Sequence, residues 1–293
     1  MAYRIDPRRA ADREVRRIAR ETLGAAIASL AEGSPQGVHD ARKRLKELRA
    51  LLRLVREPLG KRAFAHANAT FRETGQALSA SRDSAALLEC WDRLAEEEPA
   101  TFAAPSWQAI RARLAAQVTP PPDTASEGQS LIGRLEAAHA AIDDWPLQGE
   151  GFLLLRNGVL RSYRDGRRAL AAARRTPDDE HLHEWRKRAK DHWYQTRLLR
   201  DAWPGPLKAR QKALKRLADT LGDDHDLAVL GARLQEAPAL FGDAATGEAL
   251  AGLIRARRHR LQRQALRLGA RLYADKPAAL ARRWARYWAV ASD

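Results

Sequence analysis

The chain has 293 residues, 45% of them hydrophobic, which is enough to bury one large core or two of ordinary size. Its formal net charge is +15, from 52 lysines and arginines against 37 acidic residues, and this favours anionic partners such as nucleic acid, anionic lipid or a phosphorylated compound. The single cysteine, Cys90, excludes an internal disulfide framework and zinc sites made of paired cysteines.

Helix-forming residues dominate the whole chain, and β-branched residues are scarce. Breaks that contain proline or glycine separate the segments with helical periodicity. In chain order, helices are predicted near 8–31, 37–56, 61–80, 83–97, 105–117, 129–143, 151–175, 179–201, 207–221, 225–236, 245–272 and 277–290. The sequence therefore predicts an all-α protein.

The stretch TPPPDTASEG, residues 119–128, has the composition of a linker. It divides the chain into a first helical-bundle repeat over 1–118 and a second over 129–293. Together the two repeats are expected to form one functional domain.

Two pairs of similar segments support this division. HDARKRLKELR (39–49) recurs as HEWRKRAKDHW (183–193), an offset of 144 residues. LSASRDSAALL (78–88) recurs as LGDDHDLAVLG (221–231), an offset of 143. Because both pairs keep nearly the same offset, the sequence indicates an internal duplication and predicts two helical bundles related by pseudo-symmetry.

The helix that begins near His39 carries a basic stripe. At about 100° per residue, its cations fall within about 80° of His39, while its leucines gather on the opposite side. The stripe is about 16 Å long at 1.5 Å per residue, which suits several phosphates in a row. The candidate polyanion-binding residues of both copies are His39, Arg42, Lys43, Lys46, Arg49, Arg53, His183, Arg186, Lys187, Lys190 and Arg197.

A charged helix face is commonly no more than a solvated surface without a ligand. Such a face normally mixes signs as Glu–Lys pairs four residues apart, whereas this arc is almost purely cationic in both copies. Like charges at this spacing cost a few tenths of a kcal/mol per pair. Because both copies of the motif retain this repulsion between like charges, the sequence favours a polyanionic ligand that would offset it. The same cations should discourage protonation of His39 and His183 until an anion binds.

The ordered double set of these motifs resembles the CHAD domain (conserved histidine α-helical domain) family, over roughly residues 8–290. The resemblance implies two four-helix bundles with a basic central channel that binds inorganic polyphosphate, and association with polyphosphate granules. It assigns binding to His39, Arg42, Lys46, Arg49, His183, Arg186 and Lys190.

The chain departs from the family pattern at Trp193, where a basic residue is usual, and at Glu47 and Asp191, where one is common. The second stripe is therefore expected to bind more weakly than the first. Five arginines on the preceding helices are predicted to extend the channel: Arg16, Arg20, Arg161, Arg164 and Arg168.

Two other functions stay open. Phosphate contacts alone would also give sequence-independent nucleic-acid binding, with tryptophans available for base stacking. The pairs His39-Asp40 and His225-Asp226 resemble those of metal-dependent HD phosphohydrolases, although cations crowding His39 would repel a divalent metal ion. The sequence favours a protein that is not an enzyme and needs no metal or cofactor.

The location is predicted from two absences in the sequence. No run approaches eighteen apolar residues, and the start, MAYRIDPRRA, lacks the apolar core of a signal peptide. The sequence therefore predicts a cytoplasmic protein without membrane insertion, located at polyphosphate granules. Its oligomeric state is left open.

Overall fold

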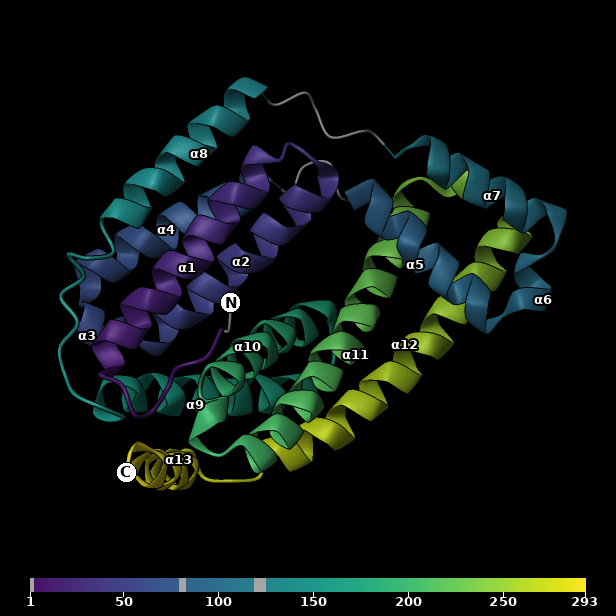
Figure 1. Cartoon of the computed structure of the whole chain (residues 1–293). Coiled ribbons are helices and arrows are strands. Elements are labelled where there is room, and N and C mark those ends of the chain that lie inside the picture. Colours follow the sequence, from purple (N-terminus) through teal and green to yellow (C-terminus); the bar gives the residue numbers. More distant parts are fainter. Residues whose placement is uncertain (1–2, 79–82, 119–124) are drawn as a thin grey trace.

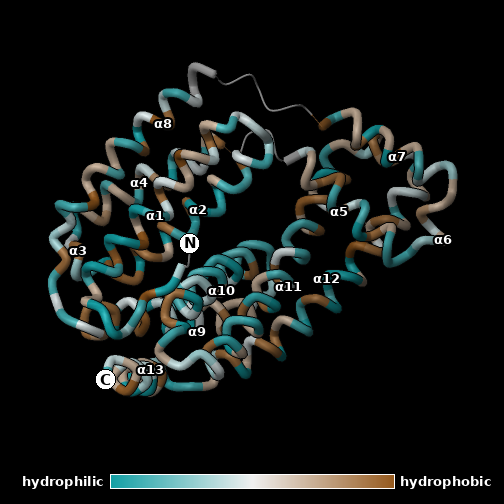
Figure 2. The backbone as a smooth tube through the Cα atoms, in the orientation of Figure 1, coloured by the Kyte–Doolittle hydropathy of each residue, from teal (hydrophilic) through white to brown (hydrophobic). Residues whose placement is uncertain are grey.

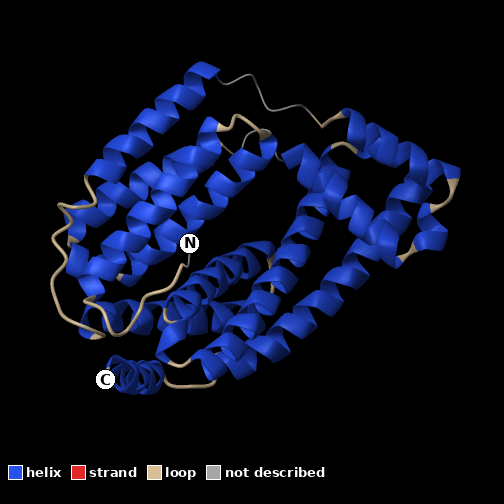
Figure 3. Ribbon diagram, viewed as in Figure 1, coloured by secondary structure: helices blue, strands red, loops and turns tan. Residues whose placement is uncertain are grey.

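A computed structural model describes residues 3–78, 83–118 and 125–293. Within these ranges the chain forms thirteen α-helices and two short 3-10 helices, with no strand, so the predicted all-α class is confirmed (Figure 3). In order they are α1 (Ala11–Ala31), α2 (Pro35–Leu54), α3 (Arg56–Leu59), α4 (Lys61–Ala77), α5 (Asp83–Glu97), α6 (Pro99–Phe102), α7 (Pro105–Ala116), α8 (Ala125–Ala140), α9 (Leu153–Arg175), α10 (Asp179–Leu198), η1 (Arg200–Ala202), α11 (Pro204–Glu236), η2 (Pro238–Phe241), α12 (Ala244–Leu272) and α13 (Pro277–Ser292).

The helices gather into three groups (Figure 1). Helices α1, α2, α4 and α8 pack together on one side of the molecule, and α9 to α12 pack together on the other, with α13 against α9. The third group is smaller: α5, α6, α7 and η2 cover the far end of the α11/α12 pair and enclose a separate hydrophobic core with Trp91 and Phe241. The two larger groups meet where α2 contacts α9 and α10.

Helices α2 and α10 carry the two copies of the basic motif, and local signals start them in the same way. The Ser34 hydroxyl accepts a hydrogen bond from the Gly37 amide, and the Asp178 carboxylate accepts one from the His181 amide. Both ends of the two helices differ by 144 residues (179 − 35 and 198 − 54), which is the offset of the sequence motifs. The common origin of the two halves stays a prediction.

The apolar face of α2 holds the two large groups together. Leu45, Leu48 and Leu51 are buried in the main core, as the helical periodicity predicted. Close approach to α9 depends on Gly158, because a Cβ atom there would lie 1.9 Å from the Leu54 carbonyl oxygen. Hydrophobic positions recur among hydrophilic ones along the helices, as the alternating colours of α12 illustrate in Figure 2.

One predicted break is wrong. Two helices were expected over 207–221 and 225–236, but α11 runs without interruption through the segment LGDDHD. The acidic residues of this segment have partners on other helices. The buried Asp224 carboxylate accepts hydrogen bonds from Arg258 and Gln262 of α12, at 3.1 and 2.9 Å. Asp226 accepts one from Arg93 of α5, at 2.8 Å. These partners stabilise the helix where the local sequence disfavours it.

Other differences from the predicted helices are smaller. The one-turn helices α3 and α6 were not predicted, and α8 begins at Ala125, within the stretch that was expected to be a linker. Residues 119–124 of that stretch and residues 79–82 of the LSASRD motif lie outside the described residues. Within the described ranges, no helix combines the length and apolar character needed to cross a membrane.

Candidate polyanion-binding site

Four helices, α2, α10, α11 and α5, line a cleft of about 710 Å³. Its basic side chains come from both copies of the motif and from α11: His39, Arg42, Lys43, Lys46, Arg186, Lys190, Lys215 and His225. Three acidic residues also line it, and two of them already pair with cations: Asp219 with Lys215 at 2.6 Å, and Asp226 with Arg93 at 2.8 Å. The cleft therefore presents an excess of positive charge.

The cleft brings together six of the eleven candidate residues from the sequence. They include two pairs at matching positions of the repeat, Arg42 with Arg186 and Lys46 with Lys190. Arg42 also donates a hydrogen bond to the Leu78 carbonyl oxygen at 3.1 Å, which ties α2 to the end of α4. Cations that lie far apart in the sequence thus face one shared space.

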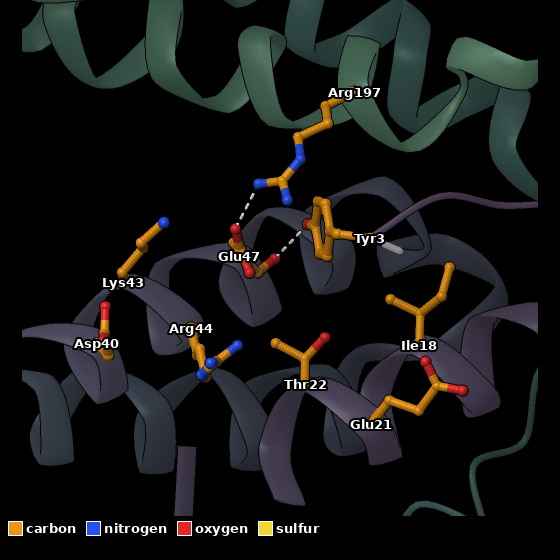
Figure 4. A pocket seen from close by; sticks show the side chains of 9 residues that line it. All are labelled: Tyr3, Ile18, Glu21, Thr22, Asp40, Lys43, Arg44, Glu47 and Arg197. Atoms are coloured by element: carbon orange, nitrogen blue, oxygen red, sulfur yellow. Dashed lines mark hydrogen bonds and ion pairs between the residues drawn. The ribbon is translucent and has the colours of Figure 1, made fainter. Parts of the chain in front are cut away.

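Arg53 and Arg197 do not line the cleft; they form two ion pairs between the halves of the molecule. Arg53 of α2 pairs with Asp191 of α10 at 2.7 Å. Arg197 of α10 pairs with Glu47 of α2 at 2.5 Å, and this second pair is drawn in Figure 4. Since Glu47 and Asp191 are themselves 144 residues apart, as are Arg53 and Arg197, the arrangement is reciprocal, like contacts across a twofold interface. We call these four residues the reciprocal clamp.

The chain start reinforces the clamp. Tyr3 donates a hydrogen bond from its hydroxyl to the Glu47 carbonyl oxygen at 2.6 Å, and the guanidinium of Arg197 lies over the Tyr3 ring, 5.1 Å from its centre (Figure 4). Two residues further on, the Ile5 amide donates to the Leu198 carbonyl oxygen at 2.9 Å. The segment before α1 therefore binds to both α2 and α10.

Burial makes the two carboxylates of the clamp dependent on their partners. Burial raises the pKa of Asp191, and the guanidinium groups of Arg53 and Arg188 oppose that rise. Asp191 has both arginines within 4 Å, whereas Arg197 is the one ion-pair partner of Glu47 among the described residues. An unpaired buried carboxylate is costly, so the clamp holds α2 and α10 at a fixed distance and orientation.

Three further candidates do not line the cleft either. Arg49 donates from Nε to Asn68 of α4 at 3.3 Å, and burial followed by the charge of Arg53 lowers its pKa. Lys187 is exposed and lies 3.6 Å from Glu184. His183 is half-buried and its ring lies 4.3 Å, centre to centre, from the ring of His225.

The His183–His225 pair is partly buried and lies near positively charged side chains. Burial lowers the pKa of His183 to about 4, assisted by His225, Lys187 and Arg186 in that order. Burial and then Arg186 also lower the pKa of His225. Both rings therefore favour the neutral form at neutral pH. The sequence attributed this preference to the surrounding cations, whereas burial is the larger cause for His183. A bound anion would favour protonation.

Gly222 of α11 lies against the guanidinium of Arg186. A Cβ atom at this position would lie 3.4 Å from Nη2 of Arg186 and 3.5 Å from its Nε, which is ordinary van der Waals contact. The segment LGDDHD thus supplies a close contact for one cation of the cleft, the His225 ring that lines the cleft, and two carboxylates that fix α11 to its neighbours.

The five arginines predicted to extend the channel do not line the cleft. Arg16 pairs with Asp12 at 2.7 Å and donates to the Trp145 carbonyl oxygen, while Arg20 pairs with Asp143. Arg161 pairs with Glu57, and Arg164 lies 3.9 Å from Asp165. Arg168 is exposed on α9. Arg16 and Arg20 tie α1 to the segment after α8, and Arg161 ties α9 to α3.

Sequence reasoning missed Lys215 and Tyr194, and it suggested His225 only as a metal ligand. Two of the three could have been found from their proximity to the repeated motifs: His225 lies within LGDDHD, and Tyr194 follows the second basic motif directly. Lys215 carried no such signal, because its place in the cleft depends on how α11 packs. Within the described ranges, no three histidine, cysteine, aspartate or glutamate side chains are grouped in a way that could hold a metal ion.

Comparison with known proteins identifies the family. The sequence model of the CHAD domain matches residues 9–235, which span both basic motifs and the whole lining of the cleft. A search of curated proteins finds no match. Since the match covers most of the chain, the protein belongs to the CHAD domain family.

Proposed function

We propose that the protein binds inorganic polyphosphate in the cleft between α2, α10, α11 and α5, without catalysing a reaction. The observation that carries this proposal is that cations from matching positions of two distant motifs line one cleft. Membership of the CHAD family supports it, because the resemblance to that family implies polyphosphate as the ligand.

The chemistry of the lining suits a chain of phosphates. Arg42 and Arg186 offer guanidinium groups that can contact phosphate oxygens with two N–H donors, and Lys46 and Lys190 offer compact ammonium charges. A volume of about 710 Å³ is far more than one phosphate requires. Cations of α2 and α10, on the two sides of the cleft, would neutralise successive phosphates of a linear polyanion. Association with polyphosphate granules in the cytoplasm would follow from this affinity.

Nucleic acid is the second candidate, and a specific observation favours it. Trp193 and Tyr194 also line the cleft, and aromatic rings in a basic groove stack on the bases of single strands. Tyr194, however, is buried, and its ring packs against Tyr3 and Trp193. This packing leaves little of the ring for a base, so we favour polyphosphate.

The proposal is tested by reversing charge on both walls. Lys46→Glu together with Lys190→Glu should weaken long-chain polyphosphate binding by at least about tenfold, because two contacts become repulsive. The matched control reverses two exposed lysines away from the cleft, Lys61→Glu and Lys276→Glu. Affinity is measured by fluorescence anisotropy, and circular dichroism checks that helicity is unchanged.

Two results would overturn the proposal. If the cleft variant binds polyphosphate as well as the control variant does, the ligand binds elsewhere. If the wild-type protein with a divalent metal ion releases phosphate from polyphosphate, an HD-type phosphohydrolase activity replaces passive binding.

A further inference from the structure

A second basic groove runs between α11 and α12, outside the cleft. It has a volume of about 380 Å³ and is lined by five arginines, with Gln264 and Leu268 between them. The arginines are Arg216 of α11 and Arg260, Arg263, Arg267 and Arg271 of α12. We call this feature the arginine groove.

Carboxylates of the described residues neutralise little of the charge of the arginine groove. None of these carboxylates lines the groove, and all five arginines are exposed. In the part of the chain that the structure describes, Arg260 lies 3.8 Å from Glu97, whereas Arg263, Arg267 and Arg271 form no ion pair. This contrasts with arginines such as Arg16 and Arg20, which pair with carboxylates.

The spacing of the arginines matches an extended anion. The four on α12 follow one another at intervals of three, four and four residues, so they lie along one face of the helix. From Arg260 to Arg271 this row is about 16 Å long at 1.5 Å per residue. Like charges in such a row repel one another, and a ligand with several phosphates in line would remove the repulsion.

The arginine groove and the cleft flank the same helix. Lys215 lines the cleft, and the next residue, Arg216, lines the arginine groove. A third cation, Lys212, is exposed one turn earlier on α11. An α-helix with its side chains is only about 10 Å across, so a flexible phosphate chain can cross α11 beside these three cations.

We propose that the arginine groove is a second phosphate-chain site, which takes the continuation of a long polyphosphate chain that leaves the cleft across α11. This inference rests on the proposed function of the cleft. Among the described residues, no aromatic ring lines the groove, so this lining offers nothing for bases to stack on. Four of its five arginines lie beyond residue 235, where the match to the family ends.

The experiment compares short and long chains of inorganic polyphosphate. The groove variant is Arg263→Glu with Arg267→Glu. Its control, Arg282→Glu with Arg286→Glu, reverses two exposed arginines four residues apart on α13 and changes the net charge by the same amount. Binding of a chain short enough for the cleft alone and of a long chain is measured across a salt series.

We expect the groove variant to bind the short chain as the control does and to bind the long chain about tenfold more weakly. Its salt slope for the long chain should fall by about one for each phosphate that the altered groove no longer neutralises. The cleft variant Lys46→Glu/Lys190→Glu, measured in parallel, should lose affinity for both lengths.

Each remaining outcome contradicts one of the two proposals. If the groove and control variants bind the long chain equally while the cleft variant fails, the second site is wrong and the proposed function stands. If the cleft variant keeps the short chain, or the wild type binds neither chain, the proposed function itself fails. If the groove variant loses affinity for single-stranded RNA but not for long polyphosphate, the groove is a nucleic-acid site.

Discussion

Helices α2 and α10 occupy matching positions of the repeat and have matching ends, yet their motif residues meet different surroundings. His39 of α2 is exposed in the cleft, whereas His183 of α10 is half-buried against His225. Arg49 of α2 turns toward α4, whereas Trp193 at the matching position of α10 lines the cleft. The same backbone position therefore supplies a side chain that faces the cleft in one half and a side chain that packs against neighbouring helices in the other.

The neighbouring helices explain the difference. At an offset of about 144, α4 and α5 correspond to the two ends of α11. In the second half this segment is one helix that packs along α10, but in the first half α4 packs on α2 while α5 packs on α11 (Figure 1). The first half thus contributes a helix to the core of the second. Substitutions at matching positions of α2 and α10 should therefore have different effects.

The largest expected effect is on stability, at the reciprocal clamp. Arg197→Ala leaves Glu47 buried without an ion-pair partner and should lower the free energy of unfolding by about 3 kcal/mol. Arg53→Ala should cost only about 1–2 kcal/mol, because Asp191 keeps Arg188 at 3.6 Å. Urea denaturation of the two variants measures the difference.

A double variant tests the cause of that destabilisation. If the unpaired carboxylate is responsible, Glu47→Gln added to Arg197→Ala should recover part of the stability. Equal costs for Arg53→Ala and Arg197→Ala, or costs below about 1 kcal/mol as for a surface pair, would contradict the clamp.

The second effect concerns the pH dependence of stability, through the half-buried His183. The pKa of His183 is lowered to about 4, so the unfolded state, with a pKa near 6.5, binds more protons in between. The contribution of His183 to stability is therefore complete above pH 6.5 and is lost as the pH falls toward 4. Polyphosphate should restore stability in this window, since an anion favours the charged ring.

Titration of the histidine ring by NMR checks this prediction. In the free protein His183 should titrate near pH 4, and His225→Asn should raise its pKa, though not to 6.5, because burial is the larger cause. A ring that titrates near 6.5 in the wild-type protein would contradict the buried environment of α10.

The smallest effect is at the unequal pair Arg49 and Trp193. Trp193→Arg places another cation in the cleft and should raise polyphosphate affinity by up to about fivefold, equivalent to about 1 kcal/mol. The reverse change, Arg49→Trp, should leave affinity almost unchanged, because Arg49 does not line the cleft. Isothermal titration calorimetry measures the polyphosphate affinity of both variants. A loss of affinity in Arg49→Trp that exceeds the gain in Trp193→Arg would contradict the placement of Arg49 outside the cleft.

The sequence predicted what depends on local periodicity and on the repeat. The basic and apolar faces of α2 and the bounds of α5 follow from residue spacing. The continuity of α11 did not, since Asp224 and Asp226 are held by Arg258 and Arg93 of distant segments. The spacing that puts Arg53 and Arg197 on the basic stripe also says nothing of carboxylates on the facing helix, so their pairing required the tertiary structure.

The most direct test of polyphosphate binding in the cleft is a competition experiment at fixed salt concentration. Labelled long-chain polyphosphate bound to the wild-type protein is challenged with unlabelled polyphosphate, single-stranded RNA or duplex DNA at equal phosphate concentration. If the cleft binds polyphosphate, unlabelled polyphosphate should displace the label and excess nucleic acid should not. Displacement by RNA or DNA as effective as that by polyphosphate would contradict a polyphosphate-binding cleft and support sequence-independent nucleic-acid binding.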